Sequence, residues 1–392
     1  MLLFKIFAIF SLVATLPSFV VFFRLNIKNS KSKFLKRYFW VIPIVIVLGL
    51  AYISFIAPKT FINDHFVGGW MIIIYLALIT PRLLLSIVLL ISWPFKIAYK
   101  GLTRPLLIVT AILTLIVELC IFYGVFIGRY KFEVKEFTYE SAQLPKAFDN
   151  YRIAQISDIH IDSWKNNKGA LERFVKLVND QKADMIVFTG DLVSGRTNEL
   201  DGFDDILAKL QAKDGVFSIL GNHDYGDYYR SWSSPEEAEM SFQDLLNRQA
   251  KMGWILLNNE HQFIYKDNDS IALIGVENVG EPPFSNYGDL PKAMQGTEES
   301  FQLLLSHNPS HWRREVLPKT DIDLMLSGHT HAMQLELFNR SPAAWAYEEW
   351  QGGYTYGNQT LYVNIGAGEV GIPLRFGAWP EITIITLKHK SK

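Results

Sequence analysis

Seven side chains of the types that bind divalent metal ions lie in five short patches between residues 158 and 331. They are Asp158, His160, Asp191, Asn222, His307, His329 and His331. Imidazole and hard oxygen donors without sulfur are typical of sites for Mn²⁺, iron or Zn²⁺. A carboxylate has two oxygens, so Asp191 can bridge two cations. The set therefore indicates a hydrolytic centre with two metal ions.

Each patch alone also has an ordinary explanation. Asp158 and His160 could be solvated residues at a strand end, Gly190-Asp191 could be a plain turn, and a single histidine such as His307 is more often structural. The two patches 221–224 and 328–331 are more specific, because each combines a glycine with several metal-binding residue types after an apolar run. The occurrence of all five patches in one chain is what favours a metal site.

The patches lie at the ends of predicted strands. From residue 150 onward, apolar strand-like runs alternate with helical patterns, which predicts an α/β layered fold. The predicted strands are 151–157, 184–189, 215–220, 271–276, 301–306, 322–327, 361–365 and 381–387, and the predicted helices are 168–181 and 235–252. Positions two apart on a strand point the same way, so we expect Asp158 and His160 to converge on one ion, and likewise His329 and His331. The irregular stretch 341–359 is predicted to be a long loop or cap.

Residues 1–130 are dominated by apolar runs and are predicted to form a transmembrane region, followed by a soluble domain over 131–392. Four stretches approach or exceed the ~20 residues that cross a bilayer: 2–23, 39–57, 70–93 and 105–127. Within them, Arg82 and Glu118 are expected to pair, because an isolated charge in the bilayer is costly. The alternative is a helix broken at Pro81 with Arg82 facing water.

The charges of the loops predict the orientation in the membrane. The segments 24–38 and 94–104 carry lysines and arginines and no acid, so they are expected to stay in the cytoplasm. Both termini, and everything after residue ~128, are then outside the cytoplasm. The net charge of −1 gives no basis for nucleic-acid binding, and the single cysteine, Cys120, excludes an internal disulfide framework.

Taken in order, the patches resemble those of the calcineurin-like metallophosphoesterase superfamily, and most closely its bacterial membrane-associated branch. The likeness covers about residues 150–390 and includes Ser306-His307-Asn308-Pro309, Leu326 to His331, and the runs Pro373 to Gly377 and Pro380 to Ile382. The resemblance implies a four-layer α/β fold in which two facing mixed β-sheets are flanked by helices.

The resemblance also implies a role for each site residue. One metal ion would be held by Asp158, His160, Asp191 and His331, and the other by Asp191, Asn222, His307 and His329. His223 would be a catalytic residue that faces the substrate, and Asp224 would orient it. The family often has a second acid where this chain has Ser194, so the surroundings of the centre are expected to differ there.

The function expected from the sequence is that of a membrane-anchored phosphohydrolase with two metal ions, Mn²⁺ being favoured over iron and Zn²⁺. A hydroxide that bridges the metals would attack phosphorus, and His223 would protonate the leaving oxygen. We expect an integral protein of the plasma (inner) membrane with its catalytic domain outside the cytoplasm. Its substrate would be a lipid-linked or cell-wall phosphate, with monoester, diester and pyrophosphate all left open, as is the oligomeric state.

Two other functions fit the same sequence. One is a pyrophosphohydrolase of a nucleotide-linked lipid precursor, acting at the cytoplasmic face. The other is a non-enzymatic metal-binding membrane module. The 341–359 stretch has two explanations as well, since its aromatic residues suit either an interfacial or sugar-binding cap or ordinary packing. These residues are Trp345, Tyr347, Trp350, Tyr354 and Tyr356.

Overall fold

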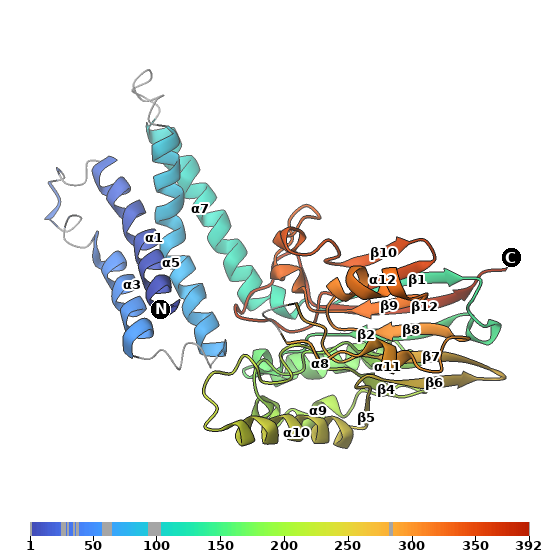
Figure 1. Ribbon diagram of the computed structural model, residues 1–392. Helices are drawn as coiled ribbons and strands as arrows, with labels where there is room; N and C mark the ends of the chain where they lie inside the picture. The colour runs from blue at the N-terminus through green and yellow to red at the C-terminus, as the bar shows by residue number, and fades with distance from the viewer. Residues whose placement is uncertain are drawn as a thin grey trace. The chain divides into compact units, whose positions relative to one another are not determined.

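The protein divides into two compact units in this computed structural model (Figure 1). The first comprises Met1–Val125 with Gly371–Pro373, and the second comprises Phe126–Val370 with Leu374–Lys392. The structure describes residues 2–24, 29, 31–33, 36, 39–56, 65–92, 103–281 and 285–391. The second unit, which contains all seven predicted ligands, is called the catalytic unit below.

The first unit contains a helix at each of the four predicted spans. The helices are α1 (Leu2–Arg24), α3 (Val41–Ala51) with the π-helical turn η2 (Tyr52–Ile56), α5 (His65–Ile91) and α7 (Thr103–Phe126). Two apolar stretches, Val67–Ile91 and Pro105–Tyr130, are long enough to cross a bilayer, whereas Ile9–Phe23 and Val41–Phe55 are shorter. A four-helix transmembrane region is therefore not confirmed. The loops 24–38 and 94–104 lie mostly outside the described residues, so the predicted orientation stays a prediction.

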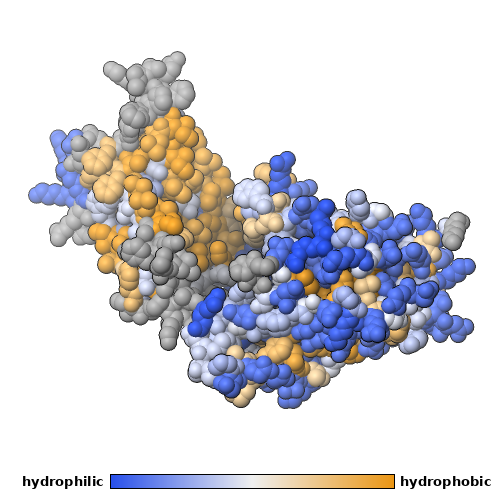
Figure 2. Space-filling view, viewed as in Figure 1, coloured by the Kyte–Doolittle hydropathy of each residue, from blue (hydrophilic) through white to orange (hydrophobic). Residues whose placement is uncertain are grey.

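The helices of the first unit present apolar side chains at their surface (Figure 2). In α7, Ile108, Leu115, Leu119 and Phe122 each expose more than half of their side chains. Large exposed apolar surfaces are rare in soluble monomers and mark contacts with a membrane or a partner. This surface therefore suggests that the unit associates with a membrane.

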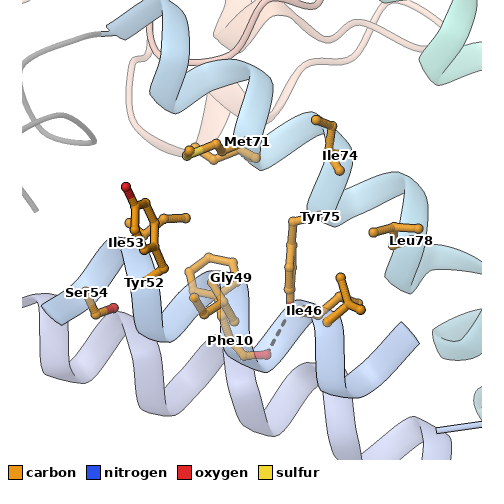
Figure 3. Close-up of a pocket in the computed structure, with 13 residues that line it drawn as sticks. Phe10, Ile46, Gly49, Tyr52, Ile53, Ser54, Met71, Ile74, Tyr75 and Leu78 are labelled. Atoms are coloured by element: carbon orange, nitrogen blue, oxygen red, sulfur yellow. Dashed lines mark hydrogen bonds between the residues drawn. The ribbon is translucent and has the colours of Figure 1, made fainter. Parts of the chain in front are cut away.

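An apolar pocket of about 480 Å³ lies among α1, α3 with η2, and α5 (Figure 3). At its edge the Tyr75 hydroxyl donates a hydrogen bond to the carbonyl oxygen of Phe10 (2.9 Å). Elsewhere in this unit, Arg82 donates to the carbonyl oxygen of Phe39 (3.3 Å). The expected Arg82–Glu118 ion pair does not form among the residues that the structure describes, and Nε of Arg82 and Oε1 of Glu118 are both buried without a hydrogen-bond partner.

The catalytic unit is built on two mixed six-stranded sheets. The first has the order β1-β12-β2-β3-β4-β5, and the second has the order β10-β11-β9-β8-β7-β6. The strands of the first sheet are β1 (Glu133–Ser141), β2 (Tyr151–Ile156), β3 (Met185–Phe188), β4 (Val216–Ser218), β5 (Trp254–Leu256) and β12 (Glu381–His389). Those of the second are β6 (Glu260–Lys266), β7 (Asp269–Gly275), β8 (Phe301–Leu305), β9 (Leu324–Ser327), β10 (Gly352–Tyr356) and β11 (Gln359–Val363).

Both sheets have a parallel core. Strands β2 to β5 run parallel in the first sheet, and β7, β8, β9 and β11 run parallel in the second. Strand β12 pairs antiparallel with β2, and β6 and β10 are antiparallel edge strands. Because parallel strands end at the same edge, the segments that follow them are brought together there.

Apolar side chains from both sheets form one buried layer between them, which includes Ile153, Val187, Leu303 and Leu326. A second cluster covers the other face of the first sheet under α8 (Lys168–Asp180) and α10 (Pro235–Lys251). A third covers the second sheet under α11 (Leu290–Met294), the π-helix η8 (Trp312–Val316) and α12 (Leu317–Lys319). Helices thus flank a pair of mixed sheets, as the resemblance implied.

Local sequence explains where the two long helices begin. The Asn167 side chain accepts a hydrogen bond from the Ala170 amide at the start of α8, and Ser234 accepts one from the Glu237 amide at the start of α10. Such N-caps satisfy amides that have no partner within the helix. Leu171, Phe174 and Val178 then bury one face of α8.

All eight predicted strands and both predicted helices are present, with shifted ends. Four strands were missed: β1, β5, β6 and β10. The last of these lies inside the 341–359 stretch, so the prediction of an irregular loop there is wrong for Gly352–Tyr356. All four are edge strands with exposed residues, and the mixed polar and apolar sequence of β1, β6 and β10 gives a weak signal.

Candidate metal centre

The predicted ligands lie just beyond the ends of five parallel strands. Strands β2, β3 and β4 of the first sheet end at Ile156, Phe188 and Ser218, before Asp158, Asp191 and Asn222 respectively. His160 follows Asp158 two residues later, and strands β8 and β9 of the second sheet end at Leu305 and Ser327, before His307 and before His329 and His331 respectively. The edge shared by the two sheets therefore collects all seven side chains.

Five of the seven have left-handed backbone conformations. The φ angles are 51° for Asp158, 41° for His160, 63° for Asp191, 77° for His329 and 49° for His331. Residues with a Cβ rarely adopt positive φ, and such outliers gather at functional sites. The predicted cause of convergence, alternation along a strand, is therefore wrong. Strands β2 and β9 have already ended, and left-handed turns aim these side chains inward.

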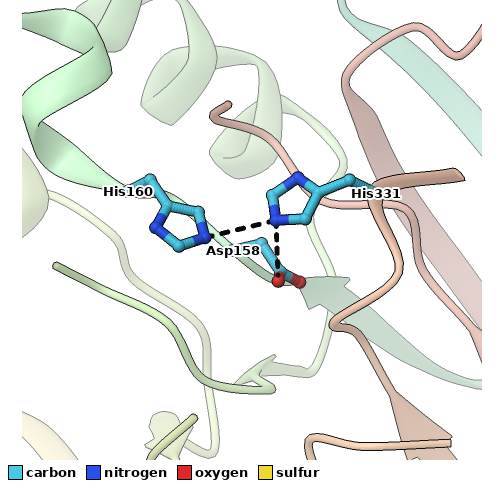
Figure 4. A group of neighbouring side chains, drawn as sticks. All are labelled: Asp158, His160 and His331. Carbon is cyan, nitrogen blue, oxygen red and sulfur yellow. Dashed lines mark hydrogen bonds and ion pairs between the residues drawn. The ribbon is translucent and has the colours of Figure 1, made fainter. Parts of the chain in front are cut away.

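One group of ligands consists of Asp158, His160 and His331 (Figure 4). All three are buried, and Nε2 of His331 lies 3.2 Å from Oδ1 of Asp158 and 3.2 Å from Nε2 of His160. One donor atom from each residue lies within 4.8 Å of the others. A single cation placed among them could contact all three.

A second group consists of Asp191, His307 and His329. Nε2 of His307 lies 3.2 Å from Oδ2 of Asp191 and 3.1 Å from Nδ1 of His329. Asn222 joins this group, because its Oδ1 lies 3.0 Å from Nε2 of His307. The structure thus brings together every ligand predicted for the second ion.

Asp191 connects the two groups through a single oxygen. Its Oδ2 lies 3.2 Å from Nε2 of His307 and 3.5 Å from Nε2 of His160. Its other oxygen, Oδ1, accepts the backbone N–H of His223 at 2.8 Å. The geometry therefore leaves Oδ2 as the atom that two ions could share.

The orientation of the donors fits cations. Nδ1 of His307 faces the carbonyl oxygen of Thr189 at 2.8 Å and must donate to it, so Nε2 carries the lone pair that points into the centre. Nδ2 of Asn222 donates to the Tyr228 hydroxyl at 3.0 Å, which turns Oδ1 inward. Several acceptors that face one another at about 3 Å need a positive charge between them.

The electrostatics of His307 lead to the same conclusion. Burial lowers the pKa of its imidazole, but the carboxylate of Asp191 more than offsets this effect and raises the pKa to about 9. At neutral pH the position of His307 therefore attracts a proton or another cation. The same environment holds the pKa of Asp191 well below its usual range, because the nearby histidines outweigh the effect of its burial.

Further contacts hold the histidine rings in place. Nδ1 of His160 lies 3.2 Å from Oγ of Ser194, whose hydroxyl donates to Asp162. Tyr347 places its hydroxyl 3.0 Å from Nε2 of His329. Partners of this kind fix the ring that binds a metal and tune its basicity. Ser194 stands where an acid was expected, and its hydroxyl group links the His160 ring to the Asp162 carboxylate.

Arg375 lies behind His331. Its guanidinium is fully buried, donates to the carbonyl oxygens of Gly368 and Ala378, and has Nη2 3.0 Å from Nδ1 of His331. Sequence reasoning assigned no role to this residue, although it lies in the 373–377 run that carried the resemblance. A charged residue inside an otherwise apolar run was the available signal. Nothing in the sequence pointed to Thr189 or Tyr228.

The predicted role of Asp224 is wrong. Its two carboxylate oxygens accept four backbone N–H groups, those of Asp191, Leu192, Val193 and Gly221, at 2.8–3.1 Å. The His223 ring instead places Nδ1 2.7 Å from the carbonyl oxygen of Ser194. Asp224 therefore ties together the loops that carry Asp191 and Asn222 and does not orient His223.

His223 faces a pocket of about 430 Å³ beside the second group of ligands. Since Nδ1 must donate to the Ser194 carbonyl, Nε2 is the ring atom that can exchange a proton with a bound molecule. The lining residues are Asn222, His223, Tyr228, Asn278, Gly280, Glu281, Asn308, Ser310, His329, Ala346 and Tyr347. A molecule in this pocket would reach both the candidate metal centre and a proton donor.

Several known proteins are similar to this chain in sequence. The sequence profile of the calcineurin-like phosphoesterase family matches residues 151–333. An uncharacterised metallophosphoesterase of Bacillus subtilis, YkuE, is 31% identical over 278 residues, which cover 68% of this chain and 89% of that protein. A zebrafish (Danio rerio) protein, named transmembrane protein with metallophosphoesterase domain, is 30% identical over 292 residues. That match covers 72% of this chain and 62% of the zebrafish protein.

Proposed function

The chain belongs to the calcineurin-like phosphoesterase family and is a metal-dependent phosphoesterase, and we propose that it works with two metal ions that share Asp191. One observation carries this proposal: a single carboxylate oxygen lies between two groups of candidate ligands. Asp158, His160 and His331 would complete one ion's shell, and Asn222, His307 and His329 the other's.

Two divalent ions at these positions would lower the pKa of a bound water toward neutrality and screen the charge of the phosphoryl group. The donor set fits Mn²⁺, iron or Zn²⁺, and we favour Mn²⁺. Because neither lysine nor arginine is among the described residues that line the pocket, these ions would also supply most of the positive charge that a phosphate needs.

The chain's own residues position the substrate and move a proton. His223 donates from Nε2 to the leaving oxygen, since its Nδ1 is held by Ser194. Tyr228 packs on the His223 ring, with the ring centres 4.5 Å apart, and keeps that ring facing the pocket. A proton donated in this way contributes roughly 10²–10⁴ in rate.

The first unit would anchor the enzyme in a membrane. The support is its apolar surface, its two helices of spanning length and a similar protein named as transmembrane. We propose an integral protein of the plasma (inner) membrane with the catalytic unit outside the cytoplasm, acting on a lipid-linked or cell-envelope phosphate. The charged loops support this orientation.

Metal analysis and hydrolysis test the dinuclear proposal. The purified full chain, loaded with manganese in detergent, should hold two ions and cleave a chromogenic phosphodiester such as bis(p-nitrophenyl) phosphate. A protein that binds one ion yet turns over fully would contradict the shared role of Asp191.

Accessibility to a membrane-impermeant reagent tests the orientation. A thiol placed at the C-terminus in a Cys120→Ala background should react in intact cells if the catalytic unit is outside. A thiol that reacts only after lysis would favour the alternative, a cytoplasmic-face pyrophosphohydrolase of a nucleotide-linked lipid precursor.

A further inference from the structure

The segment 333–345 exposes four large apolar side chains beside the pocket. Met333 and Leu337 are about half exposed (47% and 48%), and Phe338 and Trp345 are 97% and 90% exposed. These residues belong to a compact fold-back. The helical turns η9 (His331–Gln334) and η10 (Pro342–Trp345) pack together, and Ser341 donates to the carbonyl oxygen of Ala332. We call this surface the aromatic tip.

Phe338 occupies a position that is unfavourable for its residue type. Leu337 and Arg340 exchange both backbone hydrogen bonds, at 2.9 and 3.0 Å, across a two-residue turn. Phe338 and Asn339 fill this turn with φ angles of 53° and 59°. Glycine and asparagine suit such turns, whereas a phenylalanine there is strained and leaves its ring in solvent. Neither packing nor backbone preference within the chain accounts for it.

The aromatic tip is fixed to the catalytic site at both ends. It follows His331, a candidate ligand, and precedes Ala346 and Tyr347, which line the pocket. Tyr347 in turn hydrogen-bonds the candidate ligand His329. Whatever the tip contacts is therefore held next to the pocket.

The aromatic residues expected to form a cap fall into two groups in the structure, one partly buried and one exposed. Tyr347, Trp350 and Tyr354 are partly buried against their own unit and act in packing. Trp345 and Tyr356 are exposed. Phe338, which is the most exposed of these aromatic residues, lies outside the predicted 341–359 stretch, because a single phenylalanine after Leu335 and Leu337 gives no signal of an exposed cap in the sequence.

We propose that the aromatic tip docks on the surface of the lipid bilayer and holds the mouth of the catalytic pocket against it. Tryptophan and phenylalanine are the side chains that enter the interfacial region of membranes. The catalytic unit begins at Phe126, the last residue of α7, whose apolar stretch is long enough to span a bilayer. Because the catalytic unit follows this helix directly, it stays close to the bilayer. The local concentration of lipid around the aromatic tip is then high enough for a weak apolar contact to hold.

This inference rests on the proposed membrane anchoring and deepens the proposed function. A pocket held at the bilayer selects phosphates that are carried on membrane lipids over soluble phosphoesters. The reacting phosphate would lie in the headgroup layer, with its hydrocarbon part still in the membrane.

Fluorescence quenching in proteoliposomes tests the docking directly. The full chain, with Cys120→Ala, would carry a fluorophore on a cysteine at Phe338 or Trp345 and be reconstituted in phosphatidylcholine with phosphatidylglycerol. A matched control carries the same fluorophore at Tyr265, which is 74% exposed on β6. We expect brominated lipids to quench the two tip positions at least several-fold more than the control.

Quenching of the same samples by aqueous iodide gives the results that would contradict docking on lipid. Equal access of aqueous iodide to the tip and the control would overturn the proposal. Shielding of the tip from both quenchers would also overturn it, because a protein surface, such as a second copy of the chain, would then cover the tip.

A kinetic arm separates docking from catalysis. The Phe338→Asp, Trp345→Asp double variant should raise KM for a vesicle-borne phospholipid substrate roughly tenfold, the effect of losing two interfacial aromatic contacts. Its kcat/KM for bis(p-nitrophenyl) phosphate should equal that of the unchanged chain. An equal loss on both substrates would contradict docking. A chain without hydrolytic activity would refute the proposed function, while the quenching result would still decide the docking.

Discussion

Replacing Asp224 with asparagine separates a loop-supporting role from the catalytic role expected from the sequence. The carboxylate accepts two backbone N–H groups on each of its oxygens. An asparagine has one acceptor oxygen, so it can satisfy only one of these pairs. Its NH₂ group then faces the two remaining N–H donors.

The cost follows from those two donors. Each buried N–H left without an acceptor costs about 1–3 kcal/mol, so the variant should lose about 2–6 kcal/mol of the free energy of unfolding. For a unit of this size, each kcal/mol lowers the midpoint of thermal unfolding by about 2–4 °C. The expected shift is therefore on the order of 10 °C. Metal affinity should fall as well, because three of the four N–H groups belong to the Asp191–Val193 loop.

The assay combines melting with leaving-group dependence, at pH 8. Burial, assisted by the Asp191 carboxylate, raises the pKa of Asp224 to about 7, so the carboxylate form predominates there. The Asp224→Asn variant should melt earlier and lose activity equally on esters with good and poor leaving groups. Unchanged melting together with a loss confined to poor leaving groups would refute this reasoning and restore the role of orienting His223.

Three further outcomes follow from other parts of the catalytic unit. His223→Ala should keep both metal ions and lose roughly 10²–10⁴ in rate on poor leaving groups, and an undiminished rate would exclude proton donation by this residue. Gly221→Ala should weaken metal binding, seen by titration calorimetry, because the added Cβ would collide with the Asp191 carboxylate, whereas Gly169→Ala has no such contact. Burial raises the pKa of Asp323 from 3.8 to about 6, so the folded chain keeps a proton that the unfolded chain releases, and stability falls as pH rises from about 4 to 6. Asp323→Asn should remove up to about 3 kcal/mol of that fall, and a pH–melting profile identical to that of the unchanged chain would contradict it.

The sequence predicts the core of the fold well and its edges poorly. Buried parallel strands such as β3 have continuous apolar sequences, and all four residues of β3 are buried. The edge strand β1 mixes charged, polar and apolar residues without regular alternation and gives no such signal. In the first unit, apolar composition predicts the positions of helices but not which of them cross a bilayer.

The site was predictable as a set of residues but not as a set of contacts. Patches that combine aspartate, asparagine and histidine after apolar runs indicated the seven candidate ligands, and the structure brings these side chains together. The left-handed conformations at Asp158 and His329 follow from the surrounding fold and are not encoded in those residue types. The same limit explains the wrong prediction for Asp224. It is adjacent to His223 in the sequence, but the His223 ring makes its hydrogen bond to the Ser194 carbonyl instead.

Metal stoichiometry in the Asp191→Asn variant tests the central claim most directly. Asp191 accepts an N–H at Oδ1 and faces both histidine groups with Oδ2. An asparagine that keeps the first contact must turn its NH₂ group toward the centre, where it cannot bind a cation. Elemental analysis of the full chain should find two manganese ions per molecule in the unchanged protein and fewer than two in the variant. Hydrolysis should be lost in parallel. A variant that keeps both ions and its activity would show that the two groups of ligands do not share this oxygen.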